Sequence, residues 1–396
     1  MTTQDTPALS GVGLCLSGGG FRAALFHLGA LRRLNDSGVL PRLATVSSVS
    51  GGSIASGLLA AVWPSLRADA RGRFENFDSV YEASLRAFCR GDRRTGPLLT
   101  ERLNPLHWPQ LASGDQSATN LLADVYVEAL VSDLRLQHLE AVAASGGPTF
   151  IINACNLQTG ANFTFSGARV GDWRLGYAHL PELRLADAIA ASSAFPGAFP
   201  PLVLHVPEGA LSGGALAESP EHAAIAARVL LTDGGVYDNL GLEPVWKRHA
   251  VILCSDGGKP AKVDPDPGVS MIPRLLRVQS IMGEQAIALR KRWLIDRLER
   301  GVAQGTYWGI GTDIAGYATR EPGFRGEALA LLRRVRTDLN AFSDPLQEVL
   351  INHGWLLADA ALRTYTPALA QVAPPRSSPP FPERMSMEAV REALAD

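Results

Sequence analysis

The sequence predicts an α/β fold with a mainly parallel central sheet, because an apolar run, a glycine turn and a helical pattern follow one another twice near the N-terminus. The first apolar run covers residues 11–17 and ends at three glycines, 18–20. The second covers residues 43–49 and is followed closely by Gly51 and Gly52. The chain has 396 residues, 46% of them hydrophobic, which is enough for a substantial core.

The elements that follow can be assigned from their spacing. Apolar residues repeat at helical intervals over residues 21–34 and 54–62. Residues 64–145 are mostly helical in pattern and are interrupted by prolines, which indicates a helical insertion within one domain spanning 10–366. Five further apolar runs are expected to form strands, at residues 149–157, 162–166, 201–206, 228–235 and 249–258.

The two ends of the chain differ from this domain. Residues 1–9 are expected to be a flexible tail. Helical patterns over residues 270–366 indicate a C-terminal helical extension, and the proline-rich segment 367–396 is expected to be extended or mobile.

A long, arginine-rich helix is expected near the start of this extension. From residue 274 to residue 300 it carries seven basic and three acidic residues, a net charge of +4. Its apolar residues keep helical spacing: Leu275, Val278, Met282, Ala286, Leu289 and Trp293. The simpler interpretation is a solvated charged face with the apolar stripe packed inward, and the alternative is a surface that touches an anionic membrane.

The composition excludes several classes of function. The net charge of −2 provides no field for binding nucleic acid. No signal peptide is recognisable, and no apolar run approaches the roughly 20 residues of a membrane span. We therefore expect a cytoplasmic protein, with peripheral contact to a membrane as the remaining option. The four cysteines are far apart and follow no metal-site spacing, so neither a metal nor a cofactor is expected.

The turn after the second apolar run, TVSSVSGGSIASG, is rich in serine. A nucleophile elbow places a serine on a sharp strand-to-helix turn, with small residues two positions before and after it. Ser50, flanked by Ser48 and Gly52, and Ser53 each nearly fit G-x-S-x-G. The strand ends at Val49, so Ser50 stands where the elbow must be, whereas Ser53 would lie in the helix or cap it. This turn alone is equally consistent with a capped strand–helix junction without catalysis.

The first glycine turn could stabilise an oxyanion. Gly18, Gly19 and Gly20 can expose consecutive amide groups at the start of a helix, whose positive end favours negative charge. A nucleotide site is less consistent with the sequence, because no G-K-[ST] follows and Ala23 replaces the last glycine of G-x-G-x-x-G. Arg22 is either a solvated charge or a guanidinium that faces a phosphate.

Three residues are candidates for the base that activates Ser50. Asp233 directly follows an apolar strand in TDGGVYDN, and partial burial would raise its pKa enough for it to accept a proton. Asp256 has the same local sequence, Asp-Gly-Gly. His353 could complete a conventional triad, although its surroundings are helical in pattern.

Three motifs, LSGGGFRAALFHLGAL, SSVSGGS and TDGGVYDNLGLEPV, occur in an order that resembles the patatin-like phospholipases. The resemblance covers roughly residues 11–258. It implies a three-layer α/β/α fold and a Ser–Asp dyad without histidine. Ser50 is then the nucleophile, Asp233 the base and Gly18, Gly19 and Gly20 the oxyanion donors.

The sequence departs from the family pattern at two positions. Ser48 replaces the first glycine of the elbow, and Ala23 replaces a glycine after the oxyanion turn. The turn GGGFRA is similar to that of the cytosolic phospholipase A2 relatives, in which the arginine assists phosphate-bearing substrates, so the resemblance makes Arg22 a substrate-binding candidate. Asp256 matches no catalytic residue of the family and is expected to be structural.

The resemblance implies a serine acyl hydrolase that cleaves phospholipid or lysophospholipid esters through an acyl-enzyme. Two alternatives stay open from the residues themselves. One is an esterase or thioesterase that pairs Ser50 with His353, and the other is a non-catalytic regulator that binds lipid or phosphate.

Overall fold

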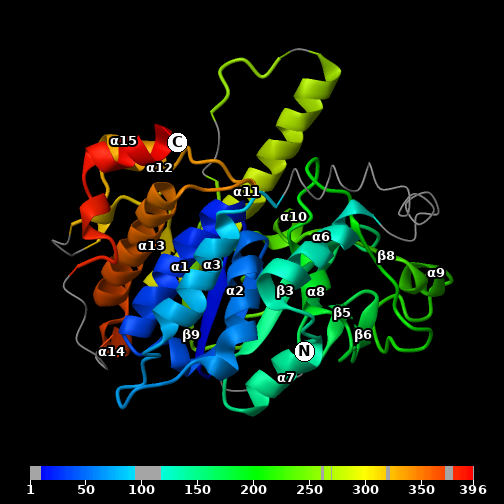
Figure 1. Ribbon diagram of the computed structural model, residues 1–396. Helices are drawn as coiled ribbons and strands as arrows, with labels where there is room; N and C mark the ends of the chain where they lie inside the picture. Colours follow the sequence, from blue (N-terminus) through cyan, green and yellow to red (C-terminus); the bar gives the residue numbers. More distant parts are fainter. Residues whose placement is uncertain are drawn as a thin grey trace.

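A mixed sheet of ten strands organises the computed structural model, which describes residues 10–93, 117–259, 263–268, 270–317, 322–370 and 378–395 (Figure 1). Five strands run parallel in the order β10-β9-β1-β2-β3. Their bounds are β1 Val12–Leu16, β2 Leu43–Val49, β3 Thr149–Asn156, β9 Val251–Asp256 and β10 Gln304–Gly309. The antiparallel strands are β4 Asn162–Phe165, β5 Val170–Asp172, β6 Gly176–Ala178, β7 Leu202–Leu204 and β8 Val229–Asp233.

Helices cover both faces of the sheet, which confirms the α/β/α architecture. One face packs against α1 (Gly20–Asp36), α2 (Gly51–Val62) and α13 (Asp344–Tyr365), and the other against α10 (Gly235–Asp238) and α11 (Met271–Glu299). Side chains alternate between the two faces of a strand. Leu14 and Leu16 accordingly belong to the larger core, while Cys15 between them belongs to a second core with Val245 and Leu294.

Strand β3 has two partners along one edge. Its first half pairs in parallel with β2, up to Val49 opposite Asn153. Its second half pairs antiparallel with β8, beginning at Asp233 opposite Ala154. Strand β4 occupies the other edge of β3. The ends of β2 and β8 therefore meet head-on beside the middle of β3, and this meeting point positions the site described below.

Helices α1 and α13 cross at very short range. A Cβ added at Gly29 would lie 1.9 Å from the Ile351 carbonyl oxygen, and one at Gly354 would lie 1.9 Å from the Phe26 carbonyl oxygen. A buried ion pair with 2.5 Å between Arg33 Nε and Asp359 Oδ1 also joins the two helices. The C-terminal extension is therefore part of the main core rather than an appended unit.

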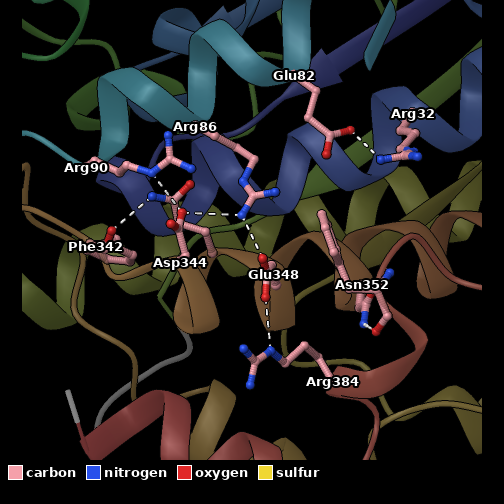
Figure 2. A network of polar contacts seen from close by, with 11 residues as sticks. Arg32, Glu82, Arg86, Arg90, Phe342, Asp344, Glu348, Asn352 and Arg384 are labelled. Atoms are coloured by element: carbon pink, nitrogen blue, oxygen red, sulfur yellow. Dashed lines mark hydrogen bonds and ion pairs between the residues drawn. The ribbon is translucent and has the colours of Figure 1, made fainter. Parts of the chain in front are cut away.

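A network of arginines and carboxylates extends this contact to the insertion (Figure 2). Arg86 belongs to α3 (Ala83–Cys89), and its Nη2 lies 3.3 Å from Asp344 Oδ1 and 2.8 Å from Glu348 Oε1 of α13. Arg384 binds the other oxygen of Glu348 at 2.9 Å. Glu348 thus holds together three segments that are far apart in the sequence.

The remaining helices are short. In the described part of residues 64–145 they are η2 Trp63–Ser65, η3 Asp78–Glu82, α3, α6 Ala118–Tyr126, η4 Val127–Val131 and α7 Leu136–Ala144. Elsewhere they are η1 Leu40–Arg42, α8 Leu185–Ser192, α9 His222–Ala227, η5 Ile314–Gly316, α12 Gly326–Leu332, α14 Pro367–Ala370, η6 Pro382–Arg384 and α15 Met387–Ala395. None of the described helices is long and apolar enough to cross a membrane.

The C-terminal segment and helix α11 differ from the sequence-based expectation. The proline-rich C-terminal segment, expected to be extended, ends in helix α15, because Val390 and Ala393 bury an apolar side of that helix against the body of the protein. The N-terminal tail, residues 1–9, lies outside the described residues. The apolar stripe of α11, expected to pack inward, does so only near its C-terminal end: Trp293 packs against the second core, but Met282 is 68% exposed.

Candidate active site

Ser50 and Asp233 meet where β2 and β8 end. Ser50 follows the last residue of β2, and Asp233 is the last residue of β8. The Ser50 side chain lies close enough to the Asp233 carboxylate to lower the pKa of that carboxyl group. Both residues are buried, with exposed fractions of 8% and 3%. Asp233, expected to follow a strand directly, is the last residue of β8, which is antiparallel to β3 and approaches from the opposite direction to β2.

The backbone at Ser50 adopts an unusual conformation, with φ 51° and ψ −118°. A positive φ in a non-glycine residue is strained, and the sharp turn of a nucleophile elbow requires such strain. Two contacts hold the turn. The Ser50 amide donates to Ser192 Oγ at 2.9 Å, and Gly51 lies so close to Gly20 that a Cβ at Gly51 would be 2.1 Å from the Gly20 carbonyl oxygen.

A buried hydroxyl network lies beneath the elbow. Ser192 Oγ donates to the Asn153 carbonyl at 2.6 Å, accepts from the Ser50 amide and lies 2.8 Å from Ser53 Oγ. Ser48 Oγ, at the position where a glycine was expected, accepts from Ser56 Oγ at 2.6 Å and lies 3.1 Å from Ser53 Oγ. The departure at Ser48 therefore supplies a member of this network.

Sequence reasoning did not identify Ser192 as part of the site. It lies near the end of α8, in the block ADAIAASSAFPGAFPP, and its amino-acid type gives no sign of its partner 142 positions earlier. The available signal was two consecutive serines, Ser192 and Ser193, at the end of an alanine-rich helix.

Burial raises the pKa of Asp233 to about 6, and hydrogen bonds from Ser50 and from the Gly235 amide oppose this effect. The Gly235 bond to Asp233 Oδ1 is 2.7 Å long. A carboxylate with a pKa near the working pH can both accept and return a proton, which is what a general base requires.

The glycine turn lies directly beside Ser50. A Cβ added at Gly18 would be 3.0 Å from Ser50 Cβ. The Gly18 amide is already used, because it donates to the Asn239 carbonyl at 3.1 Å. The amides of Gly19 and Gly20 donate to no described residue, and Gly20 begins α1, where the helix dipole favours negative charge. Of the three glycines expected to donate, only Gly19 and Gly20 thus have an available N–H.

A neutral histidine anchors this turn from below. His27 Nε2 donates to the Ser17 carbonyl at 2.9 Å, and Nδ1 accepts from Ser255 Oγ at 2.8 Å. Burial lowers the pKa of His27 to about 4, so the ring stays uncharged near neutral pH. The Gly52 amide also donates to the Ser17 carbonyl, at 3.1 Å. One carbonyl therefore connects the glycine turn to the serine elbow.

Arg22 occupies neither of the positions expected for it. Its side chain is fully buried and donates to the carbonyls of Gly257, at 2.9 and 3.3 Å, and Val335, at 2.8 Å. Burial lowers the pKa of Arg22 to about 10, and nearby Asp256 opposes this effect. Because both contacts are to backbone carbonyls far along the chain, Arg22 joins the glycine turn to the C-terminal extension rather than facing a phosphate.

The rival bases are committed to other contacts. Asp256 accepts hydrogen bonds from the Tyr307 hydroxyl at 2.6 Å and from the Gly258 amide at 2.9 Å. His353 donates from Nε2 to the Ile310 carbonyl at 2.8 Å and packs against Phe26. Burial lowers the pKa of His353 to about 4. Neither geometry is that of a base for Ser50.

This fold and site define a class of protein: an α/β/α sheet with a serine at a strained strand–helix elbow, a buried carboxylate beside it and a glycine turn alongside. The model of one family, patatin-like phospholipase, matches residues 14–246, which is more than half of the chain. The chain therefore belongs to the patatin-like phospholipase family.

Several solved structures are similar to this chain at low sequence identity. Human GIVD cytosolic phospholipase A2 is 15% identical, with 98% of this chain and 63% of that chain covered and a TM-score of 0.47. Its complex with methyl gamma-linolenyl fluorophosphonate is also 15% identical, with 98% of this chain and 60% of that chain covered and a TM-score of 0.49. VipD from Legionella pneumophila is 16% identical, with 98% of this chain and 75% of that chain covered and a TM-score of 0.35. The chain thus spans about three fifths of the human chains. No curated protein sequence matches it.

Proposed function

We propose that the protein is a serine acyl hydrolase that cleaves the fatty-acyl esters of phospholipids or lysophospholipids. The observation that carries this proposal is the placement of Ser50, on its strained elbow, beside the buried carboxylate of Asp233, whose pKa the serine hydroxyl lowers. Family membership supports the lipid ester as the class of substrate.

The reaction has two halves. Asp233 accepts the proton of Ser50 Oγ as that oxygen attacks the ester carbonyl carbon. The tetrahedral intermediate then collapses, the C–O bond to the glycerol breaks, and Asp233 returns the proton to the leaving alkoxide. In the second half Asp233 takes a proton from water, the hydroxide attacks the acyl-enzyme, and the proton passes back to Ser50 as the fatty acid leaves.

Two features support stabilisation of the oxyanion in both halves. The amides of Gly19 and Gly20 are available as donors, and α1 directs its N-terminal dipole toward them. Each preorganised donor contributes about 3 kcal/mol to the transition state. Gly18 orients the turn through its bond to Asn239 rather than donating to the substrate.

The test compares matched variants on defined phospholipids, with the products identified by mass spectrometry. We expect fatty acid and lysophospholipid from the wild type and none from Ser50→Ala. Asp233→Asn should lose turnover by at least about a thousandfold, as removal of a general base does. Asp256→Asn, in the same Asp-Gly-Gly sequence, should keep most of it. Substantial turnover by Asp233→Asn would refute the dyad.

Covalent labelling separates the alternatives. A fluorophosphonate probe should label the wild type and Ser53→Ala but not Ser50→Ala. A protein that bound lipid without being labelled would be a non-catalytic regulator. A His353→Ala variant that folds and retains labelling and turnover would eliminate the triad.

A further inference from the structure

The N-terminal part of α11 projects from the body of the protein, as Figure 1 shows in yellow-green. The helix spans Met271–Glu299, 29 residues, so it is about 43 Å long. Strand β9 has six residues and spans only about 20 Å. The crossover helix is therefore roughly twice as long as the sheet is high, and one end of it must extend beyond the sheet.

The topology shows which end extends. Strand β10 begins at Gln304 opposite Val251, the first residue of β9, at the edge where the parallel strands start. Because α11 ends at Glu299, just before β10, its C-terminal end lies at that edge. Its N-terminal end then projects past the opposite edge, where Ser50 follows β2. The projecting part is thus on the same side of the protein as the candidate active site.

The projecting part is apolar and has little contact with the body. Seven apolar side chains between residues 271 and 282 are 40–68% exposed: Met271, Ile272, Leu275, Leu276, Val278, Ile281 and Met282. The spacing of Met271, Leu275, Val278 and Met282 places them on one face of the helix, with Ser280 opposite. Ile272 and Leu276 widen the apolar surface on one side, toward Ser280. A soluble protein exposes such a face at a cost, which indicates that the face has a partner.

The charge of this segment and its surroundings indicate which partner. Within residues 271–284 the ionisable residues are Arg274, Arg277 and Glu284, and Arg277 Nη1 lies 3.8 Å from Glu284 Oε1, so the projecting part carries a net charge of +1. Phe195, which follows the residue bonded to the Asp233 amide, is 62% exposed, and Val236, three residues after Asp233, is 51% exposed. Apolar side chains are therefore present both on α11 and next to the dyad.

The helix is anchored beside the dyad where it leaves the body. Arg290 Nε lies 3.5 Å from Asp238 Oδ1, and its guanidinium stacks over the Tyr237 ring at 5.2 Å. Tyr237 and Asp238 belong to α10, the turn that follows Asp233. The orientation of α11 is thereby linked to the segment that carries the base.

We propose that residues 271–283 of α11 form a membrane-docking helix, which inserts its apolar face into the interface of a bilayer containing anionic phospholipid and holds the edge that carries Ser50 against it. The inference rests on the proposed function, because a phospholipid hydrolase must reach its substrate in a bilayer. An apolar face flanked by arginines fits that surface, since the acyl region receives the apolar side chains and the headgroups pair with the cations.

The first test measures insertion at single positions. All four native cysteines are buried, so a cysteine introduced at Met282 or Ser280 can be labelled selectively with an environment-sensitive fluorophore. In a Ser50→Ala background, vesicles of phosphatidylcholine with anionic phosphatidylglycerol should shift the emission of Met282→Cys to the blue. Ser280→Cys, on the opposite face, should change little. Equal shifts at both positions, or none at Met282→Cys, would overturn the proposal.

The second test separates docking from chemistry. Leu275→Asp combined with Met282→Asp should weaken vesicle binding and slow hydrolysis of vesicle phospholipid by about tenfold or more. The same variant should hydrolyse a soluble short-chain ester at the wild-type rate. Ser280→Asp is the charge-matched control for Met282→Asp alone, since each adds one negative charge. If the wild type did not hydrolyse the short-chain ester, the proposed hydrolase function would be refuted. Binding of Ser50→Ala to vesicles would still test the membrane-docking helix independently. A lipid-free dimer dissociated by the double variant would make a second copy the partner and overturn the proposal.

Discussion

At the residue scale, the strained conformation of Ser50 depends on a neighbour that takes no part in the chemistry. The Ser50 amide has Ser192 Oγ as its acceptor, and Ser192 is held by the Asn153 carbonyl on β3. Since β3 also pairs with both β2 and β8, the same strand aligns the proposed nucleophile, the proposed base and the hydroxyl that fixes the turn.

Ser192→Ala should therefore reduce catalysis without abolishing it. The change leaves the Ser50 amide without its acceptor, and an unsatisfied buried group costs about 1–3 kcal/mol. We expect kcat on a short-chain ester to fall about tenfold with KM nearly unchanged. Ser193→Ala is the matched control, because Ser193 Oγ donates to the Ile189 carbonyl of α8 and lies 3.0 Å from the Tyr126 hydroxyl, without a hydrogen bond to the elbow in the described part of the chain. An equal loss in both variants would indicate a general destabilisation of α8.

The pKa of Asp233 should appear in the pH dependence of activity. Burial raises this pKa to about 6, and only the ionised carboxylate can accept the proton of Ser50. We expect kcat/KM to rise with pH and to reach half of its plateau near pH 6, with a slope of one. If the pKa obtained from this pH profile changed strongly with temperature, the titrating group would be a histidine instead of a carboxyl group.

The same shift predicts that Asp233→Asn stabilises the fold. The pKa of Asp233 is raised from 3.8 to about 6 on folding, so the unfolded chain loses this proton first. Stability is therefore lost as pH rises between these values, by about 3 kcal/mol at pH 8. Asp233→Asn should raise the thermal midpoint at pH 8 and have little effect at pH 4. A lower midpoint at pH 8 would contradict this account.

At the scale of elements, the close crossing of α1 and α13 makes a glycine indispensable. A Cβ at Gly354 would lie 1.9 Å from the Phe26 carbonyl oxygen, so alanine would force the two helices apart. We expect Gly354→Ala to lower the free energy of unfolding by about 2–3 kcal/mol.

Gly283 provides the control for this substitution. It also lies within a helix, but a Cβ there would meet nothing within 4 Å. Gly283→Ala should raise helix propensity and stability by about 0.5–1 kcal/mol. Opposite signs in chemical denaturation of the two variants would separate close packing from propensity, and equal signs would contradict the crossing.

The sequence predicted the elements around the two glycine turns well, because strand, turn and helix there are each determined by local pattern. It predicted neither the antiparallel approach of β8 nor the exposed face of α11. An apolar run looks the same whether its strand runs parallel or antiparallel, and an apolar stripe looks the same whether it packs inward or projects. Both depend on neighbours distant in sequence.

The site residues divide in the same way. The elbow and the Asp-Gly-Gly turn are short local motifs that made Ser50 and Asp233 candidates, but Asp-Gly-Gly also occurs at Asp256, and only the resemblance to a family chose between the two. The buried position of Arg22 could not be, since its acceptors are carbonyls at Gly257 and Val335, more than 230 residues away. The engagement of the Gly18 amide by Asn239 is a similar long-range contact.

At the scale of the whole molecule, the C-terminal extension supports the active site. The Phe21 amide donates to the Asp338 carbonyl at 3.1 Å, and a Cβ at Gly20 would lie 2.1 Å from the Thr337 carbonyl oxygen. The glycine turn is thus enclosed by residues beyond the part that the family model matches, and truncation before residue 335 would remove these contacts.

The whole molecule should lose stability in acid because of two buried histidines. The pKa values of His27 and His353 are lowered by burial from 6.5 to about 4, so both rings are neutral in the folded protein. Their contribution is complete above pH 6.5 and is lost as the unfolded chain takes up protons between pH 6.5 and 4, at about 3 kcal/mol per ring. As pH falls from 6 to 3.8, the raised pKa of Asp233 adds stability to the folded state. This gain offsets about as much free energy of unfolding as one histidine ring loses.

We therefore expect urea unfolding at pH 7, 6, 5 and 4 to give a free energy of unfolding that falls by about 3 kcal/mol over this range from these groups. His27→Gln isolates one ring, because the glutamine amide can still donate to the Ser17 carbonyl while it cannot be protonated. Between pH 6.5 and 4, unfolding of this variant should take up about one proton fewer than unfolding of the wild type, so its free energy of unfolding should depend less on pH. If wild type and His27→Gln lost stability in parallel, His27 would not be a neutral anchor of the glycine turn.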